Sequence, residues 1–247
     1  MPSKPEIQDY FTKRAPVYDH SAAWVKDGYL KSWLLENIKV NPATRVLDVA
    51  TGTGALSAIF YRRAGLVVGL DFTPAMCRTA RTKMDYLIYG DGEILPFASD
   101  SFDLIVIRQG LQFMNLLKTT NEIYRICNSV GQVVIVQLTA YSPVDSPEAF
   151  EIQRFRNPVR QNFFLEEDLN ALLKKNGWRN IRTFPYYSYE SVNEWITKAA
   201  IPADRQEQIR RLYENSSPDF RRIHEIKFVD GDIIDKMKMT IAVGDKK

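Results

Sequence analysis

The chain has 247 residues, of which 45% are apolar and 26% are charged, and 33 Lys and Arg against 30 Asp and Glu give a net charge of +3. This balance predicts a globular protein and argues against disorder or a strongly basic nucleic-acid binder. Two cysteines and two histidines argue against a disulfide framework or a Cys/His zinc site. No apolar window is long enough to span a membrane and the N-terminus lacks a signal-peptide pattern, so we expect a cytoplasmic protein with no stable membrane insertion.

Strands and helices are expected to alternate through most of the chain. Residues 1–40 are predicted to be helical, because apolar residues recur at helical spacing up to an Asn-Pro stop. Strands are predicted at residues 45–50, 66–71, 84–89, 102–107 and 132–137, and helices between them at residues 55–63, 74–82 and 116–127. The strands are rich in Val and Ile and show little polar alternation, which is typical of a parallel sheet covered on both faces.

The last third of the chain has a different pattern. We predict a helix at residues 164–175, a strand at 181–189 and a half-exposed closing strand at 236–243. The charged, helical segment between them is interpreted as a cap, at about residues 190–227, inserted before the last strand.

The most informative local feature is a glycine-rich turn, VLDVATGTGA at residues 46–55. A strand leads into this turn and a helix follows it, so backbone N–H groups are available to a ligand that approaches closely. The dinucleotide fingerprint requires a third glycine, and Ser57 occupies its position.

Three acidic residues follow successive predicted strands. Asp48 precedes the turn, where it would repel a pyrophosphate but attract a ligand carrying ammonium and sulfonium groups. Asp71 stands where a carboxylate commonly accepts from both ribose hydroxyls, and Asp91 could accept from an adenine amino group. This pattern favours a cationic nucleoside over a dinucleotide.

These segments together resemble the motif series of class I S-adenosylmethionine-dependent methyltransferases, in the ubiquinone/menaquinone-biosynthesis-like subgroup. The matching segments are DVATGTG at 48–54, GLD at 69–71, GDGEILPF at 90–97 and FDLI at 102–105, together with FTKRAPVYD at 11–19 and RQGLQF at 108–113. The resemblance covers roughly residues 7–185. It implies a three-layer, Rossmann-like α/β fold with a seven-stranded sheet of order 3-2-1-4-5-7-6, the last strand being antiparallel. The family's Pro-Gly-Gly turn before the fifth strand is replaced by SVG at 129–131.

The resemblance also implies a single methyltransferase domain that converts S-adenosyl-L-methionine to S-adenosyl-L-homocysteine. Its parts would be a helical lid (1–40), a cofactor-binding core (41–140) and a substrate side (141–247). The implied cofactor-binding residues are Tyr10, Tyr18, Asp48, Ala50, Thr51, Gly52, Gly54, Asp71, Phe72, Asp91, Gly92, Glu93, Arg108 and Gln109. The turn would hold the methionine portion, the acids the ribose and adenine, and the two tyrosines would close over the cofactor. Arg108 and Gln109 would line the floor beneath the sulfonium.

Methyl transfer does not require a catalytic side chain, because positioning and desolvation supply most of the rate enhancement. If a base is used, His20 is one candidate, since it follows the segment placed over the cofactor, and His224 in the cap is the other. Tyr141 could orient a substrate hydroxyl. The alternatives are a surface histidine, a cap histidine and a packing tyrosine. Cys77 and Cys127, both in expected helices, are interpreted as core thiols.

Two features of the last third bear on the substrate. Aromatic residues gather around residues 184–189, where they would line a pocket for a planar acceptor or attach the cap to the sheet. Arginines gather at residues 154–160 and 205–222, where they would bind a substrate anion or form solvated helix faces. Both alternatives stay open for each feature.

We therefore predict a methyltransferase for a small-molecule, aromatic or hydrophobic acceptor, acting as a monomer or homodimer in secondary metabolism or quinone-like biosynthesis. The acceptor atom, C, O or N, is left open. The alternatives are a non-catalytic S-adenosylmethionine-binding protein and a nicotinamide-dependent oxidoreductase. Methylation of exocyclic amines in nucleic acids lacks its Asn/Asp-Pro-Pro-Tyr/Phe motif here, so no nucleic-acid partner is expected.

Overall fold

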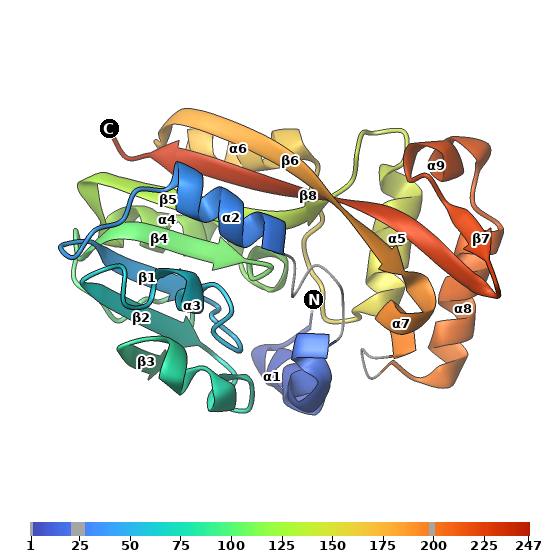
Figure 1. Cartoon of the computed structure of the whole chain (residues 1–247), viewed down its shortest axis with the longest axis horizontal. Helices are drawn as coiled ribbons and strands as arrows, with labels where there is room; N and C mark the ends of the chain where they lie inside the picture. The colour runs from blue at the N-terminus through green and yellow to red at the C-terminus, as the bar shows by residue number, and fades with distance from the viewer. Residues whose placement is uncertain (1, 21–27, 198–200) are drawn as a thin grey trace.

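A single mixed sheet organises the computed structural model, which describes residues 2–20, 28–197 and 201–247 (Figure 1). The strands are β1 (Arg45–Val49), β2 (Leu66–Asp71), β3 (Tyr86–Tyr89), β4 (Phe102–Arg108), β5 (Cys127–Thr139), β6 (Arg179–Ser191), β7 (Lys227–Val229) and β8 (Asp232–Asp245). Their order is β3-β2-β1-β4-β5-β8-β6, with the short β7 paired to β8. Strands β1 to β5 are parallel and β8 is antiparallel to both neighbours. The predicted order is confirmed, and β7 is an added hairpin strand.

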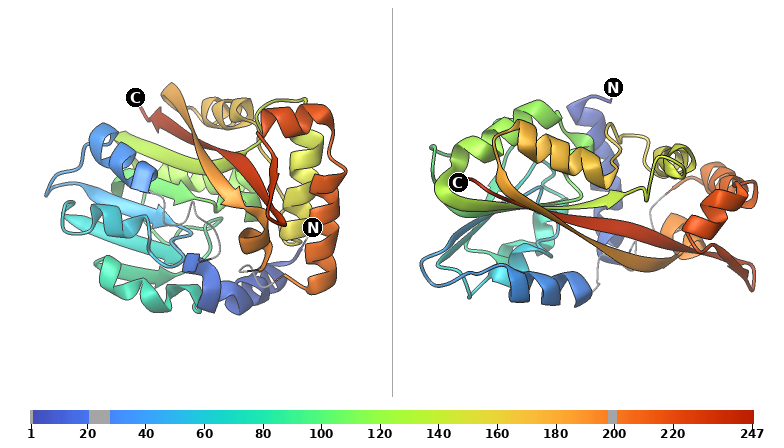
Figure 2. Two further views of the ribbon diagram at one scale, coloured as in Figure 1. Left: turned by 45° about the vertical axis from the view of Figure 1, so that its right-hand side comes forward. Right: turned by 90° about the horizontal axis from the view of Figure 1, so that it is seen from above.

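Helices cover both faces of this sheet, which gives the three layers seen from above in Figure 2. The helices are α1 (Lys4–Arg14), α2 (Gly28–Asn37), α3 (Ser57–Phe60), α4 (Leu116–Ile126), α5 (Ser146–Arg156), α6 (Glu166–Lys175), α7 (Val192–Thr197), α8 (Ala203–Glu214) and α9 (Pro218–Ile223). Successive residues of β4 point to opposite faces: Val106 packs with α2, and Ile107 with α4 and α6. None of the described helices has the length and apolar character needed to cross a membrane.

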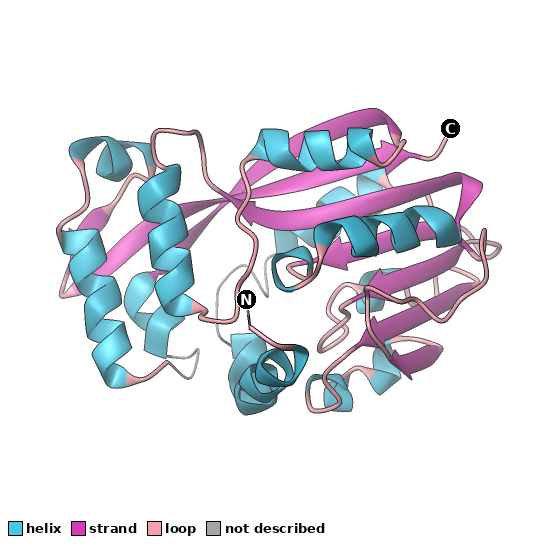
Figure 3. Cartoon of the chain, turned by 180° about the vertical axis from the view of Figure 1, so that it is seen from behind, coloured by secondary structure: helices cyan, strands magenta, loops and turns pink. Residues whose placement is uncertain are grey.

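The cap is a continuation of the sheet rather than a detached unit. Strands β6 and β8 pair over their whole length and extend beyond the parallel strands, where α5, α7, α8 and α9 pack around them (Figures 1 and 3). Buried cap residues such as Ile209 and Phe220 belong to the same apolar cluster as Val134 and Val136 of β5. The cap is therefore held by a shared core, which favours a fixed position relative to the sheet.

Several predicted elements differ from those observed. The helix expected at 55–63 is reduced to α3, and the one expected at 74–82 is two short 3₁₀ turns, Met76–Thr79 and Arg81–Lys83. Cys127 opens β5 rather than ending the helix before it, because its backbone is already extended. The single glycine left in the SVG segment is needed, since a Cβ on Gly131 would lie 2.8 Å from the Asp103 carbonyl oxygen.

Candidate active site

A cavity of about 730 Å³, including space open to solvent, lies at the carboxyl ends of β1, β2 and β4, beneath α1. We call it the strand-end cavity. Of the residues that sequence reasoning assigned to a cofactor, those that line it are Tyr18, Ala50, Gly52, Asp71, Phe72, Asp91, Gly92, Glu93, Arg108 and Gln109. The remaining four are Tyr10, Asp48, Thr51 and Gly54, which lie outside its lining.

Asp48 shapes the glycine-rich turn from below. Its Oδ2 accepts hydrogen bonds from the Thr51 hydroxyl at 2.8 Å, the Ser57 hydroxyl at 2.6 Å and the Ser57 backbone N–H at 3.0 Å. Burial raises the pKa of Asp48 to about 6, against the lowering effect of these bonds. Ser57, which stands where a dinucleotide site has glycine, therefore fixes the glycine-rich turn against Asp48 through its hydroxyl and backbone N–H.

The backbone approaches the cavity in left-handed conformations. Ala50, Gly52, Gly54 and Gln109 have φ values of 57°, 54°, 74° and 53°. Such conformations cost a non-glycine residue about 1–3 kcal/mol and cluster at functional sites. Ala50 and Gln109 both line the cavity, so the strain is located at the site itself.

The acids at the strand ends are held in place by donors. Asp71 accepts from the Gly52 N–H at 2.8 Å and from the Thr73 N–H at 2.7 Å, and burial raises its pKa despite these bonds. Asp91 forms an ion pair with Lys4 of α1, and Lys4 Nζ also lies 3.2 Å from Glu93 Oε2. Helix α1 is therefore attached across the cavity by an ion pair to the segment after β3.

A second pocket adjoins the first. This arginine pocket is lined by Phe11, Arg14, Tyr18, Gln109, Gln112, Phe113, Leu138, Gln153, Arg156, Asn157, Arg160 and Trp195. It shares Phe11, Tyr18, Gln109 and Phe113 with the strand-end cavity. Phe11 and Phe113 meet edge to face at 4.9 Å between centroids, so an aromatic pair from α1 and the loop after β4 borders both spaces.

Three glutamine side chains form a hydrogen-bonded amide cluster at this junction. Gln112 Nε2 donates to Gln109 Oε1 at 2.9 Å, and Gln137 Nε2 donates to Gln112 Oε1 at 2.5 Å. Sequence reasoning named Gln109 but missed Gln112 and Gln137. The RQGLQF segment contained a signal for Gln112, whereas Gln137 joins the cluster only through the pairing of β5 with β4.

Tyr10 and the candidate base His20 lie outside both pockets. The Tyr10 hydroxyl donates to the Arg156 carbonyl at 3.2 Å, which links α1 to α5. His20 is exposed at the end of the 3₁₀ turn Ala15–His20. The neighbouring Asp19 accepts from the Thr53 hydroxyl at 2.6 Å, so this turn is fixed to the glycine-rich loop.

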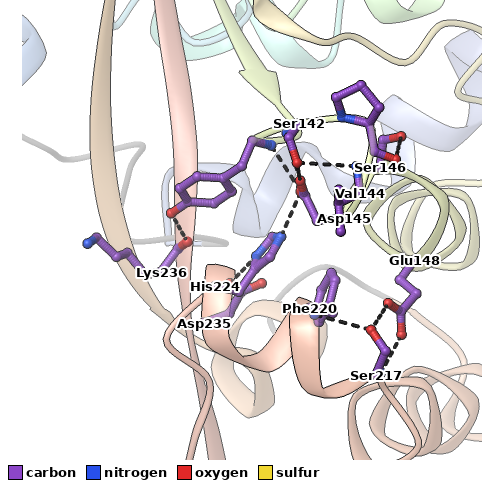
Figure 4. A network of polar contacts seen from close by, with 12 residues as sticks. Ser142, Val144, Asp145, Ser146, Glu148, Ser217, Phe220, His224, Asp235 and Lys236 are labelled. Carbon is purple, nitrogen blue, oxygen red and sulfur yellow. Dashed lines mark hydrogen bonds and ion pairs between the residues drawn. The ribbon is translucent and has the colours of Figure 1, made fainter.

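His224 joins the cap to α5 (Figure 4). Its Nδ1 lies 2.9 Å from Asp235 Oδ1, and its Nε2 lies 3.1 Å from Asp145 Oδ2. Desolvation lowers the pKa of His224, but the bonds to both carboxylates and their charges outweigh it and raise the pKa to about 9. With both nitrogens engaged and the ring protonated at neutral pH, His224 has no site to accept a proton from a substrate.

Tyr141 belongs to the same network. Its hydroxyl donates to the Lys236 carbonyl at 2.5 Å, and its ring meets His224 edge to face at 4.9 Å. Burial raises the pKa of Tyr141 well above its ordinary value, and it lines neither pocket. Burial likewise raises the pKa values of Cys77 and Cys127 to about 12, so both thiols stay protonated in the core.

A glycine-rich turn after β1, a buried acid ending β2 and acids after β3, on a sheet of this order, define the S-adenosylmethionine-dependent methyltransferase class. The cavity fits that cofactor. The acids that line it, Asp71, Asp91 and Glu93, suit ribose hydroxyls and an adenine amine. Asp48, expected from the sequence beside the ammonium and sulfonium groups, instead lies buried beneath the turn and fixes its shape.

Comparisons with known proteins agree. A family model described as "Methyltransferase domain" matches residues 47–135. A demethylmenaquinone methyltransferase from Streptomyces avermitilis is 32% identical over 188 residues, 73% of this chain and 80% of the relative. One from Renibacterium salmoninarum is 34% identical over 142 residues, 54% of this chain and 59% of the relative. The YcgJ protein of Bacillus subtilis has the same fold, with a TM-score of 0.83 at 22% identity, over 90% of this chain and 99% of that one.

The chain belongs to the class I S-adenosylmethionine-dependent methyltransferases, in the ubiquinone/menaquinone-biosynthesis-like subgroup. It is an enzyme whose cofactor is S-adenosyl-L-methionine.

Proposed function

We propose that the acceptor of this methyltransferase is a planar small molecule that lies in the arginine pocket, beside the cofactor in the strand-end cavity. The observation that carries this proposal is the shared wall: Phe11, Tyr18, Gln109 and Phe113 line both spaces. A ligand in one pocket is thus within a side chain's width of a ligand in the other. Aromatic walls favour a flat acceptor, and the relatives' printed names point to an aromatic quinone-type ring.

In this proposal the strand-end cavity orients the cofactor through the turn and the acids. Asp71 would accept from the ribose, the segment at 91–93 would contact the adenine, and the glycine-rich turn would hold the methionine portion. When bound, the cofactor supplies an electrophilic methyl group with a neutral thioether as leaving group. Gln109, fixed by Gln112, forms the neutral floor between the two ligands.

The protein's contribution to rate is positioning and exclusion of water. The described residues that line the arginine pocket include no His, Cys, Asp, Glu or Lys, and Tyr18 is the one side chain among them of a type that acts as a general base. The acceptor therefore enters in a nucleophilic state, or loses its proton to solvent, and the pocket aligns it with the methyl group.

The test is transfer of radiolabelled methyl from S-adenosylmethionine to a panel of hydroxylated benzenes and naphthalenes, with product identified by mass spectrometry. We expect turnover of at least one planar acceptor. Gly52→Val should abolish turnover and cofactor binding, because Gly52 needs φ of 54°. Gly28→Val is the matched control, since a Cβ there meets no atom of the described residues within 4 Å. Binding of the cofactor with no transfer to any planar acceptor would contradict the proposal.

A further inference from the structure

Two arginines that do not line the strand-end cavity are buried in the wall of the arginine pocket. Arg156 ends α5 and Arg160 lies in the loop after it, and their exposed fractions are 7% and 9%. Long cationic side chains are rarely buried to this extent without a paired carboxylate. The position of both in a pocket wall therefore calls for a physical explanation.

Neither guanidinium has its hydrogen-bonding capacity filled by the described residues. Three buried nitrogens find no hydrogen-bond partner among the described residues: Arg156 Nε and Nη2, and Arg160 Nη2. Arg156 lies over the Trp195 ring at 4.1 Å, and Arg160 over the Phe163 ring at 5.1 Å. One Arg160 bond is made, from Nε to the Asn162 carbonyl at 2.9 Å. The rings and that bond fix the planes of the two guanidinium groups and leave N–H donors unused.

The surrounding charge does not neutralise this pair. Desolvation and, after it, the charge of Arg14 lower the pKa of Arg156 to about 9, although Tyr10, Tyr18 and the buried Glu190 raise it. Desolvation alone lowers the pKa of Arg160 to about 9. Glu190 accepts from the Ser188 hydroxyl and is not part of the pocket lining. Among the described residues that line the pocket, three are arginines (Arg14, Arg156 and Arg160) and none is a carboxylate.

The pocket wall contains further buried polar atoms that no described residue hydrogen-bonds. In the part of the chain that the structure describes, the buried indole Nε1 of Trp195 has no hydrogen-bond partner, nor have the amide oxygens of Gln153 and Asn157, and all three residues line the pocket. Either amide can present its NH₂ group by rotation about its last bond. The described pocket lining therefore has unused N–H donors on Arg156, Arg160 and Trp195 and contains no carboxylate to accept from them.

We infer that Arg156 and Arg160 form a subsite for a carboxylate on the acceptor molecule, so that the substrate is an aromatic acid rather than a neutral ring. A guanidinium fork and a carboxylate match in shape and charge, and the pair is strongest where water is excluded. This inference rests on the proposed function, because it uses the arginine pocket as the acceptor site. It gives the pocket two ends: the methyl group arrives at Gln109, and the carboxylate lies at the arginines.

The experiment measures binding of benzoate and of the isosteric, neutral benzamide to protein saturated with S-adenosylhomocysteine, by calorimetry. Charge-assisted hydrogen bonds predict that benzoate binds roughly tenfold or more tightly than benzamide. Arg156→Gln and Arg160→Gln should each bring the two affinities to within about threefold, with S-adenosylhomocysteine affinity unchanged. Arg154→Gln removes the same charge from the exposed side of α5 and should keep the preference.

If a glutamine variant fails to fold, Arg156→Lys and Arg160→Lys replace it. Lysine retains the positive charge but cannot donate two parallel hydrogen bonds to a carboxylate, so part of the preference for benzoate over benzamide should survive. Equal affinity for the two probes, no binding of either, or a full preference in both glutamine variants would overturn the inference. Its failure is separate from that of the proposed function. Methyl transfer to a planar acceptor, together with equal affinity of the native protein for benzoate and benzamide, would leave the function intact and remove the subsite. A benzoate preference without methyl transfer to any acceptor would do the reverse.

Discussion

The strand-end cavity and the arginine pocket share four residues but carry opposite charge. In the first, Asp71 is buried but accepts from two backbone donors, and Asp91 is paired with Lys4. In the second, Arg156 and Arg160 are buried with donors unused. The contrast shows that the acids are held by donors of the protein itself, whereas both arginines keep buried N–H donors that no described residue accepts from. A positively charged cofactor on one side and an acidic acceptor on the other would satisfy both.

We expect the largest effect, on the free energy of unfolding, from replacing His224, which links the cap to α5. The cap contributes Trp195 to the wall of the arginine pocket. Replacing His224 by Gln removes a buried cation between Asp145 and Asp235, and breaking such a group lowers the free energy of unfolding by about 3–5 kcal/mol. The pKa of His224 is raised when folded, so its contribution is fully present below its ordinary value of 6.5 and is lost as pH rises through about 9. Urea unfolding of native and variant protein across this range measures the difference.

Protonation of Asp145 limits this contribution to stability at low pH. The pKa of Asp145 is lowered in the folded protein, against desolvation, chiefly by its hydrogen bond to His224, so that stability is lost as pH falls below 3.8. The difference between native protein and His224→Gln should therefore be largest between pH 4 and 6.5. A difference that does not change between pH 6 and pH 10 would show that His224 is not held as a cation.

A smaller effect is expected for cofactor binding. Asp71→Ala removes an acceptor proposed for the ribose and leaves the Gly52 N–H without its partner. We expect affinity for S-adenosylhomocysteine to fall by roughly tenfold or more, about 1.4 kcal/mol. Asp219→Ala, at an exposed position in α9, is the control for loss of one acid. Unchanged affinity in Asp71→Ala would remove that acid from the cofactor site.

The smallest effect distinguishes the two pockets most sharply. Arg156→Gln should change the free energy of unfolding by less than about 1 kcal/mol, because the lost contact with Trp195 is offset by removal of an unpaired buried charge. Urea unfolding at pH 7 measures this. A decrease in the free energy of unfolding of about 2 kcal/mol or more would mean that Arg156 stabilises the fold rather than forming a binding site for a ligand.

The sequence predicted the strand-end cavity better than the arginine pocket, for a physical reason. The cavity is built at the ends of parallel strands, so short local motifs such as residues 48–54 and 90–93 supply most of its lining. The arginine pocket joins Phe11 of α1 to Arg160, residues far apart in the chain. A run containing Arg154, Arg156 and Arg160 does not reveal that the first is exposed and the other two are buried.

The same dependence on contacts between distant residues explains why the sequence could not assign the roles of His224 and Tyr141. His224 was named because histidine is scarce, but its partners lie 79 and 11 residues away in sequence, so its role as a cap fastening depended on the fold. Tyr141 was expected near a substrate, and its hydroxyl instead serves the backbone of β8. Residue type indicates which chemistry is available, and only the packing decides whether a ring nitrogen or a hydroxyl is free to do it.

The most direct test of the opposite charges is one calorimetric series on a single sample, in which S-adenosylmethionine is titrated first and benzoate second. Binding of the cofactor, followed by binding of benzoate at least about tenfold tighter than that of benzamide, is the predicted result. Cofactor binding followed by equal affinity for benzoate and benzamide would contradict the charge assigned to the arginine pocket, and no cofactor binding would contradict the site at the strand ends.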